Sequence, residues 1–137
     1  MIHSVVMTKS YFETKGMHCQ TVDERENLLI LNIKGENLEM RVILEFTEDS
    51  EYVTVKSYNL CKFPENKLAQ MYKLCSELNK SYKWVKFYVD ESDNTITAQD
   101  DAIIQLDTCG AECYELVGRM VIIADEAYPT MMKTIWQ

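Results

Sequence analysis

The sequence predicts an α+β fold, in which helices pack on one face of an antiparallel five-stranded sheet. Short stretches of alternating apolar and polar residues indicate strands, and apolar residues at three- and four-residue steps indicate helices. Along the chain these patterns follow the order α-β-β-β-α-β-β-α. Because the 137 residues contain no repeat or linker, we expect one domain over residues 1–137.

The first 16 residues predict a helix, because apolar side chains recur there in a loose helical pattern. Gly16 tolerates a positive φ and is typical of a helix C-terminal cap. Residues 27–34 form a short apolar run rich in branched side chains, which is typical of a strand. Gly35, Glu36 and Asn37 then predict a tight hairpin turn.

The next two strands show the clearest alternation. Apolar side chains from Leu38 to Phe46 alternate with charged ones, so one face of this strand is expected to be buried. After a turn at residues 47–50, residues 51–58 alternate in the same way. Three successive strands with short connections indicate an antiparallel meander.

A second helix and a second hairpin follow. Pro64 at a first helical position and apolar residues at helical spacing predict a helix that ends near Leu78. Residues 83–90 and 95–100 predict two strands, joined by a turn at residues 91–94.

The last segment carries an apolar stripe from Cys113 to Tyr128, which predicts a long amphipathic helix. Asp107 or Thr108 is available to cap its N-terminus. Pro129 is expected to kink or interrupt this helix, because proline lacks the backbone donor and its ring clashes with the preceding turn.

The composition disfavours nucleic acid and membrane as partners. The formal net charge of -8 repels phosphate backbones and anionic lipids, and the few basic residues are scattered. No secretory signal or membrane-spanning apolar run is evident. The five cysteines are odd in number and lack the paired spacing of a disulfide framework, so we expect reduced thiols and a cytoplasmic location.

The sequence offers no recognisable catalytic arrangement. His3 and His18 are its two histidines, and both lie near the N-terminus, away from candidate nucleophiles. Four carboxylates near the last helix could gather, but acidic residues are usual at turns and helix starts; they are Asp100, Asp101, Asp107 and Glu112. We therefore predict that the protein is not an enzyme and that it has no catalytic, cofactor-binding or metal-binding residues.

Cys109 and Cys113 leave an alternative open. They are the thiol pair at helical i, i+4 spacing, so they could serve as reactive or ligating groups in a small-molecule or metal sensor with a pocket by the last helix. They could equally be two half-buried helix thiols.

Large aromatic residues are the strongest candidates for a binding surface. If the valines and phenylalanine of their strands face the helices, four rings lie on the opposite face of the sheet: Tyr52, Tyr58, Trp84 and Tyr88. Such rings favour protein interfaces, because they bury a large area at low entropic cost. They would also stabilise a sheet that is open to water on one side, and both interpretations stand.

Three segments resemble one known family: Leu78-Asn79, the aromatic strand at residues 83–90, and Ala124-Asp125-Glu126-Ala127-Tyr128-Pro129. They look like the YbjN-type putative bacterial sensory transduction regulators. The resemblance implies a type III secretion chaperone-like fold and a single YbjN-like domain. It also implies a cytoplasmic, often dimeric protein without established catalytic residues. The resulting hypothesis is a homodimeric, regulatory or chaperone-like module that binds a protein or peptide through an exposed sheet face or edge.

Overall fold

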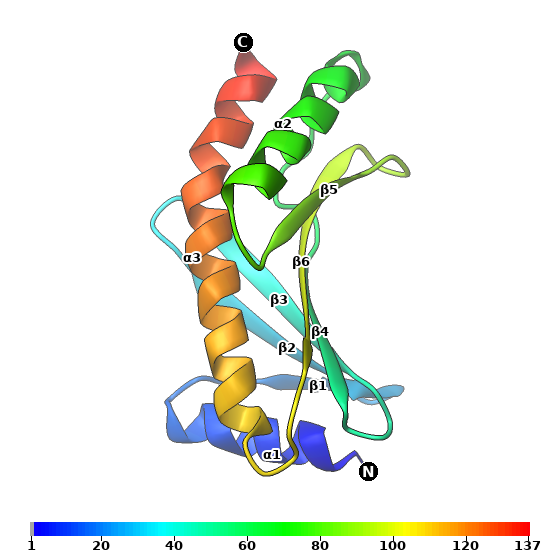
Figure 1. Ribbon diagram of the computed structural model, residues 1–137, viewed down its shortest axis with the longest axis vertical. Coiled ribbons are helices and arrows are strands. Elements are labelled where there is room, and N and C mark those ends of the chain that lie inside the picture. The colour runs from blue at the N-terminus through cyan, green and yellow to red at the C-terminus, as the bar shows by residue number, and fades with distance from the viewer. Residues whose placement is uncertain (1) are drawn as a thin grey trace.

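A computed structural model describes residues 2–137 as a six-stranded antiparallel sheet with three α-helices on one side (Figure 1). The elements are α1 (His3–Thr14), β1 (Gln20–Val22), β2 (Arg25–Lys34), β3 (Glu39–Phe46), β4 (Tyr52–Ser57), η1 (Glu65–Lys67), α2 (Leu68–Ser81), β5 (Lys86–Asp90), β6 (Thr95–Ile103) and α3 (Cys109–Trp136). The strands lie in the order β1-β2-β3-β4-β6-β5. The predicted α+β class, with its helices on one face, is confirmed.

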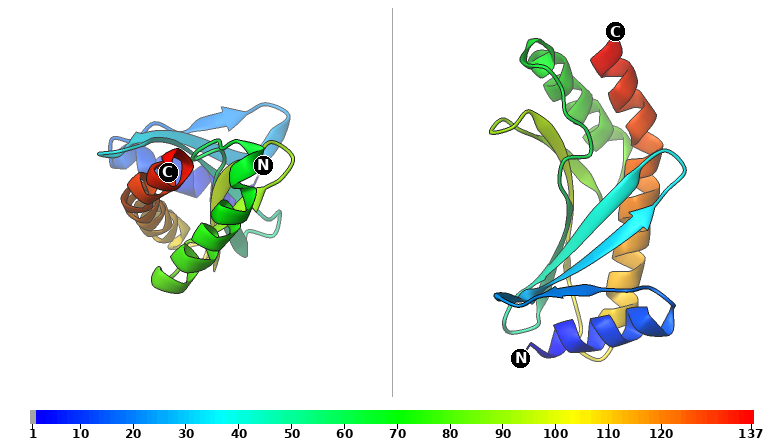
Figure 2. Two further views of the ribbon diagram at one scale, coloured as in Figure 1. Left: turned by 90° about the horizontal axis from the view of Figure 1, so that it is seen from above. Right: turned by 180° about the vertical axis from the view of Figure 1, so that it is seen from behind.

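The core lies between the sheet and α3. Alternate residues of β3 are buried against the helices, from Met40 to Phe46, and Val53 and Val55 continue this layer on β4. α3 runs along the whole length of the molecule, with α1 packed at one end and α2 beside its C-terminal half (Figures 1 and 2). Among residues 2–137, no helix covers the other face of the sheet.

The predicted first helix and its end are confirmed. α1 ends at Thr14, and Gly16 has a φ of 76°. The N–H of Met17 donates to the carbonyl oxygen of Phe12 at 3.0 Å, which satisfies a carbonyl at the helix end.

The predicted strand number was wrong, because the sheet has six strands rather than five. The additional strand, β1, pairs with β2 through Gln20 opposite Ile30 and Thr21 opposite Leu29. It has three residues, of which Gln20 and Thr21 are exposed. A strand this short and polar has no alternation from which it could have been identified.

The second hairpin is shifted relative to the prediction. β5 begins at Lys86 rather than at residue 83, because Trp84 adopts a φ of 73° that no extended strand allows. β6 continues to Ile103, three residues beyond the predicted end at residue 100. The last strand is therefore much longer than its partner β5.

The starts of α2 and α3 differ in detail from the sequence prediction. Pro64 precedes the 3₁₀ turn η1, and α2 begins only at Leu68. Thr108 occupies the N-cap position of α3, but its hydroxyl makes no capping bond. Instead it donates to Oε1 of Glu112 at 3.0 Å, and this oxygen also accepts the N–H of Gln105 at 2.8 Å.

α3 is not interrupted at Pro129, so that part of the prediction was wrong: the helix continues to Trp136. Proline has no N–H, and the carbonyl of Asp125, four residues earlier, therefore lacks its usual helical donor. Asn37 Nδ2 donates to this carbonyl at 3.2 Å from the hairpin between β2 and β3. The hairpin thus supplies the hydrogen bond that the proline removes.

The Asp125 carboxylate strengthens the same connection. It accepts the backbone N–H groups of Glu36 at 3.1 Å, Asn37 at 2.8 Å and Leu38 at 3.0 Å. Gly35 permits this approach, because a Cβ there would lie 2.3 Å from Asp125 Oδ1. We call this arrangement the Asp125 latch; it ties the β2–β3 hairpin to α3.

Candidate functional site

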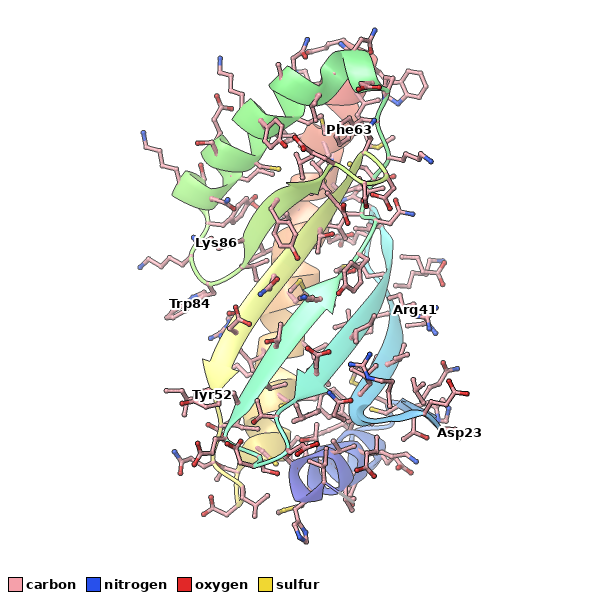
Figure 3. The ribbon with its side chains drawn as sticks, turned by 90° about the vertical axis from the view of Figure 1, so that its right-hand side faces the viewer. Asp23, Arg41, Tyr52, Phe63, Trp84 and Lys86 are labelled. Carbon is pink, nitrogen blue, oxygen red and sulfur yellow. The ribbon has the colours of Figure 1, made fainter. Side chains whose placement is uncertain are left out.

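The candidate site is the helix-free side of β4, β6 and β5, which faces the viewer in Figure 3. We call it the open face. Its side chains are Tyr52, Thr54, Lys56, Tyr58, Tyr88, Gln99, Asp101 and Ile103. Three of the four predicted aromatic residues lie on this face.

A hydrogen-bonded strip crosses the middle of the open face. The hydroxyl of Tyr88 on β5 donates to Gln99 Oε1 on β6 at 3.0 Å. Gln99 Nε2 donates to Asp101 Oδ2 at 3.1 Å, and the Thr54 hydroxyl donates to Asp101 Oδ1 at 2.7 Å. The strip links three strands and holds its side chains in fixed orientations.

Tyr58 and Tyr88 gather around Lys56 at one end of this strip. Lys56 Nζ lies 5.7 Å from the centroid of the Tyr58 ring. Burial lowers the pKa of Lys56, but the hydrogen bond to Tyr58 and the nearby phenol groups outweigh it, so the net pKa is raised. Tyr58 is 50% exposed and Tyr88 is 39% exposed. This end therefore offers two accessible rings beside a fixed cation.

Tyr52 lies at the opposite end of the open face. It pairs across the strands with Ile103, which is 70% exposed. Ile103 was not among the predicted site residues, because the strand was expected to end at residue 100. Its two-residue spacing from Asp101 was the signal that could have identified it.

Trp84 lies at the border of the open face and on none of its strands, which corrects the predicted grouping of four rings; it lines a hollow with Tyr88, Gln99 and Asp101. It belongs to the turn before β5, at the border of the sheet, and it is 59% exposed (Figure 3). Its ring faces α3, because the guanidinium carbon of Arg119 lies 4.7 Å from the ring centroid.

Arg119 also contacts a buried acid on β6. Its Nη2 lies 3.4 Å from Oδ2 of Asp100, which is 6% exposed. Burial raises the pKa of Asp100, and the charge of Arg119 offsets this only in part. Asp100 and Asp101 therefore point to opposite faces of the sheet and do not form a carboxylate pair.

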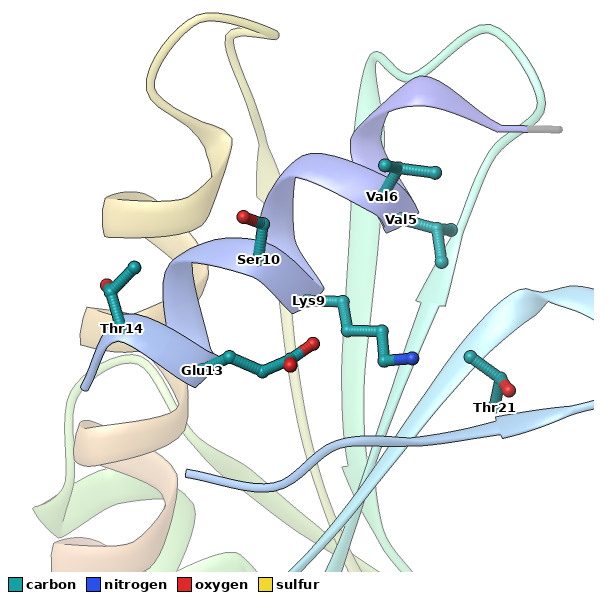
Figure 4. Close-up of a pocket in the computed structure, with 7 residues that line it drawn as sticks. All are labelled: Val5, Val6, Lys9, Ser10, Glu13, Thr14 and Thr21. Atoms are coloured by element: carbon teal, nitrogen blue, oxygen red, sulfur yellow. The ribbon is translucent and has the colours of Figure 1, made fainter. Parts of the chain in front are cut away.

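The remaining candidate groups are also separated. His3 and His18 are exposed near the N-terminus, and Glu112 is bound to the backbone of its own loop. Within residues 2–137, no group of three or more His, Cys, Asp or Glu side chains is arranged to hold a metal ion. A surface hollow between α1 and β1 has Lys9 and Glu13 along one side and Thr21 along the other (Figure 4).

Cys109 and Cys113 lie together at the interface of α1 and α3. The hydroxyl of Thr8 is 3.5 Å from Cys109 Sγ and 4.0 Å from Cys113 Sγ. Both residues are fully buried, and burial raises the pKa of Cys113 to about 12. A hollow beside α3, next to Asp125, is lined by neither cysteine. The predicted half-buried thiols are thus fully buried.

The sequence also matches a known family of proteins. The model of the YbjN family, described as "Putative bacterial sensory transduction regulator", matches residues 9–131. The chain belongs to the YbjN family. The match includes the aromatic strand β5 and the Asp125–Pro129 segment of α3, which carried the resemblance in the sequence.

Solved structures confirm the fold of this YbjN-family chain. A crystal structure of YbjN from E. coli, described as a putative transcription regulator, matches with a TM-score of 0.67 at 11% identity, over 93% of this chain and 92% of that one. A chain of the ExsC–ExsE complex matches with a TM-score of 0.61 at 13% identity, over 91% and 90%.

A chain of the ExoU–SpcU heterodimer from the type III secretion system of Pseudomonas aeruginosa matches with a TM-score of 0.53 at 10% identity, over 93% and 96%. The predicted type III secretion chaperone-like fold is thus confirmed. A search of curated proteins finds no match. In the described part of this YbjN-family chain, no helix has the length and apolar character needed to cross a membrane.

Proposed function

We propose that this YbjN-family protein is a non-catalytic bacterial regulatory or chaperone-like module that binds a protein or peptide segment through its open face. The observation that carries the proposal is the group of exposed rings on a rigid, helix-free sheet face. Tyr58 and Tyr88 stand beside Lys56, and Tyr52 stands at the other end, with the hydrogen-bonded strip between them.

The chemistry of this face suits a protein partner. Tyrosine rings bury apolar area with little loss of side-chain entropy and keep a hydroxyl for a hydrogen bond. The strip from Tyr88 to Thr54 is already ordered, so binding does not have to immobilise it. The net charge of -8 disfavours phosphate backbones and anionic lipids as alternatives.

Stabilisation of the sheet alone accounts for these rings less well. Tyr88 does bond to a neighbouring strand, through Gln99. Tyr58, however, follows the last residue of β4 and belongs to no strand pair, yet it is half exposed. A ring that stabilises no strand pair is better accounted for by a contact with a partner.

The comparisons support a protein partner and a non-catalytic role. Two of the matched folds come from complexes of two proteins, ExsC–ExsE and ExoU–SpcU. The family is described as a regulator. We also propose a cytoplasmic location, which the five free and buried cysteines support.

A crosslinking experiment tests the proposal. A photoreactive phenylalanine analogue replaces Tyr58 or Tyr88 on the open face, or Glu77 on the solvent side of α2 as the control. We expect the first two positions to crosslink a specific protein in bacterial cells that carry this gene, and the control position to crosslink none.

The captured protein is then purified and its affinity measured by calorimetry. We expect Tyr58→Ala and Tyr88→Ala to weaken binding about tenfold or more while the thermal midpoint stays within about 2 °C. Tyr72→Ala, which removes a ring of 44% exposure on α2, should leave the affinity unchanged. Equal affinities for all three variants would contradict the proposal.

A further inference from the structure

Half of β6 has a strand on one side only. β4 pairs with β6 as far as Tyr52 opposite Ile103, whereas β5 pairs with it only as far as Lys86 opposite Gln99. In the described part of the chain, no strand pairs with residues 100–103 on the side away from β4, so these residues form a free edge, about 13 Å long at the usual rise per residue. In Figure 3 this edge borders the sheet between the labels of Trp84 and Tyr52.

The turn at Trp84 creates the free edge. If β5 extended backwards in the same register, Trp84 would stand opposite Asp101. Its φ of 73° and the hydrogen bond from the Val85 N–H to the Lys83 carbonyl at 2.8 Å turn the chain away instead. The loop after α2 thus ends the pairing before the edge of β6 is covered.

The backbone groups at this edge can be assigned from the ladder. The N–H of Ile104 donates to the carbonyl of Glu51 at 2.9 Å, so residue 104 bonds toward β4. Backbone groups alternate in direction along a strand, and Ala102 and Asp100 therefore also bond toward β4. Asp101 and Ile103 direct their N–H and C=O groups to the free edge, where the Asp101 N–H also interacts with the Asp100 carboxylate.

The side chains beside these groups specify what could pair with them. On the open face, Asp101 is a charged neighbour and Ile103 an apolar one, two residues apart. Glu51 and Asp107 add exposed negative charge at the same end of the sheet. Two nearby cations already have partners: Arg119 is paired with Asp100, and Lys86 Nζ donates to the backbone carbonyls of Asn79 and Tyr82.

We propose that the free edge of β6 receives an extended peptide segment of the partner protein as an additional strand, with a basic residue opposite Asp101 and an apolar residue opposite Ile103. This inference rests on the proposed function and specifies the class of segment bound. Main-chain hydrogen bonds to Asp101 and Ile103 supply affinity, and the two cross-strand pairs supply selectivity.

Charge argues against a second copy of this chain as the occupant. Pairing two β6 edges would bring Asp101 of each chain close together, and like charges across a strand pair are destabilising. Asp100 points toward the helices at the same edge, and inward charges oppose edge-to-edge pairing. A peptide segment with basic residues would not place a second carboxylate opposite Asp101 and would not bring a second inward-pointing Asp100 to the edge.

The test uses the ¹⁵N-labelled full chain and the acetylated peptide Thr-Val-Thr-Lys-Thr-Val-Thr-Lys as probe. In an added strand, the Val and Lys residues direct their N–H groups to β6 and the Thr residues direct theirs away. We expect the amide signals of Asp101 and Ile103 to shift on titration. N-methylation of Val and Lys should weaken binding about tenfold, and N-methylation of Thr should not.

Two protein variants provide an independent check. Ile103→Pro removes an N–H that points to the free edge and spares the ladder with β4, so it should abolish binding, whereas Ile103→Thr retains it. Asp101→Lys should reverse the preference, from the Lys peptide to one with Glu in its place. The N-methylated peptides leave the protein unchanged, so the test does not depend on whether Ile103→Pro folds.

The outcomes separate this inference from the proposed function. Absence of shifts at Asp101 and Ile103 at millimolar peptide would overturn the inference, while the crosslinks from Tyr58 and Tyr88 would still decide the proposed function. Shifts at these amides that depend on protein concentration without peptide would indicate a second copy, and would also overturn it.

Discussion

Asp125 joins α3 to the β2–β3 hairpin through four hydrogen bonds. Its carboxylate accepts three successive backbone N–H groups, and its carbonyl accepts Asn37 Nδ2. We expect Asp125→Ala to lower the free energy of unfolding by about 2–3 kcal/mol, because hydrogen bonds to charged groups are lost and three donors are left to water. Urea denaturation measures the change.

Asp125→Asn is the matched control for this prediction. It keeps one acceptor oxygen but places an amide opposite the Glu36 N–H, so it should cost about 1 kcal/mol. A loss below about 0.5 kcal/mol for Asp125→Ala would show that the latch contributes little to stability.

The buried thiols give a second prediction at the residue scale. Burial raises the pKa of Cys61 and Cys113 to about 12 and that of Cys19 and Cys75 to about 11. We expect the native protein at pH 8 to resist a thiol reagent for about an hour, and all five cysteines to react in urea. Rapid labelling of Cys113 in the native state would mean that α1 separates readily from α3.

The raised pKa values of these thiols make the stability of the protein depend on pH. The folded pKa values lie above the ordinary value of 9.0, so the unfolded chain releases these protons first. The thiols' contribution to stability is therefore complete below about pH 9 and is lost as the pH rises toward 12.

At this scale, residues in regular patterns were predictable and long-range partners were not. Tyr88 was placed correctly because alternation along a strand determines its face. Trp84 was misplaced because nothing in its neighbours signals a left-handed φ. Arg119 pairs with an acid 19 residues away, and Asp125 bonds to a turn 87 to 89 residues away. The spacing of residues within one helix or strand gives no information about such distant pairs.

Glycines in two elements allow a paired prediction. Gly35 lies in the β2–β3 hairpin, where an added Cβ would meet the fixed Asp125 carboxylate, whereas Gly118 in α3 has nothing within 4 Å of such an atom. We expect Gly35→Ala to destabilise the protein by about 1–3 kcal/mol and Gly118→Ala to stabilise it by about 0.5–1 kcal/mol. Thermal unfolding of both variants gives the comparison.

The Asp125 latch also predicts how these changes combine. Because Asp125→Ala removes the group that the new methyl would meet, Gly35→Ala should cost less in that background. Fully additive losses would argue that the glycine is needed for another reason.

Where a helix or strand has a long, regular pattern of apolar residues, the sequence correctly predicted which type of element it is. β3 and β4 alternate along their whole length and were found with ends correct to within about two residues. β1 could not be found, because its stability comes from pairing with β2 and not from its own side chains. Asn37 donates to the Asp125 carbonyl, which Pro129 leaves without its helical donor, and because the two residues are 88 apart in sequence only the fold reveals this contact.

For the whole molecule, the resemblance to the YbjN family predicts a homodimer. We expect sedimentation equilibrium to give a mass near twice 16.0 kDa over a wide concentration range. The mass of one chain at all concentrations would contradict the dimer. The same experiment on Tyr58→Ala would show whether the open face takes part in self-association.

The overall fold was predictable because each face of the sheet has a distinct composition. The apolar face from Met40 to Phe46 requires a covering layer, and the amphipathic segments supply it. For the site, the sequence predicted which face of the sheet is open. It did not predict where this face ends, because that depends on where β5 begins and how far β6 continues.

The placement of α1 against α3 has a consequence for the chain as it is made. Thr8 meets Cys109 across 101 residues of sequence. At bacterial rates of about 5–20 residues per second, the ribosome needs about 5–20 seconds to make the second partner after the first. Through that interval Phe12 and its neighbours on α1 have no docking surface on α3. The part of α1 that packs on α3 therefore stays uncovered during this time, and it is buried only once α3 has been made.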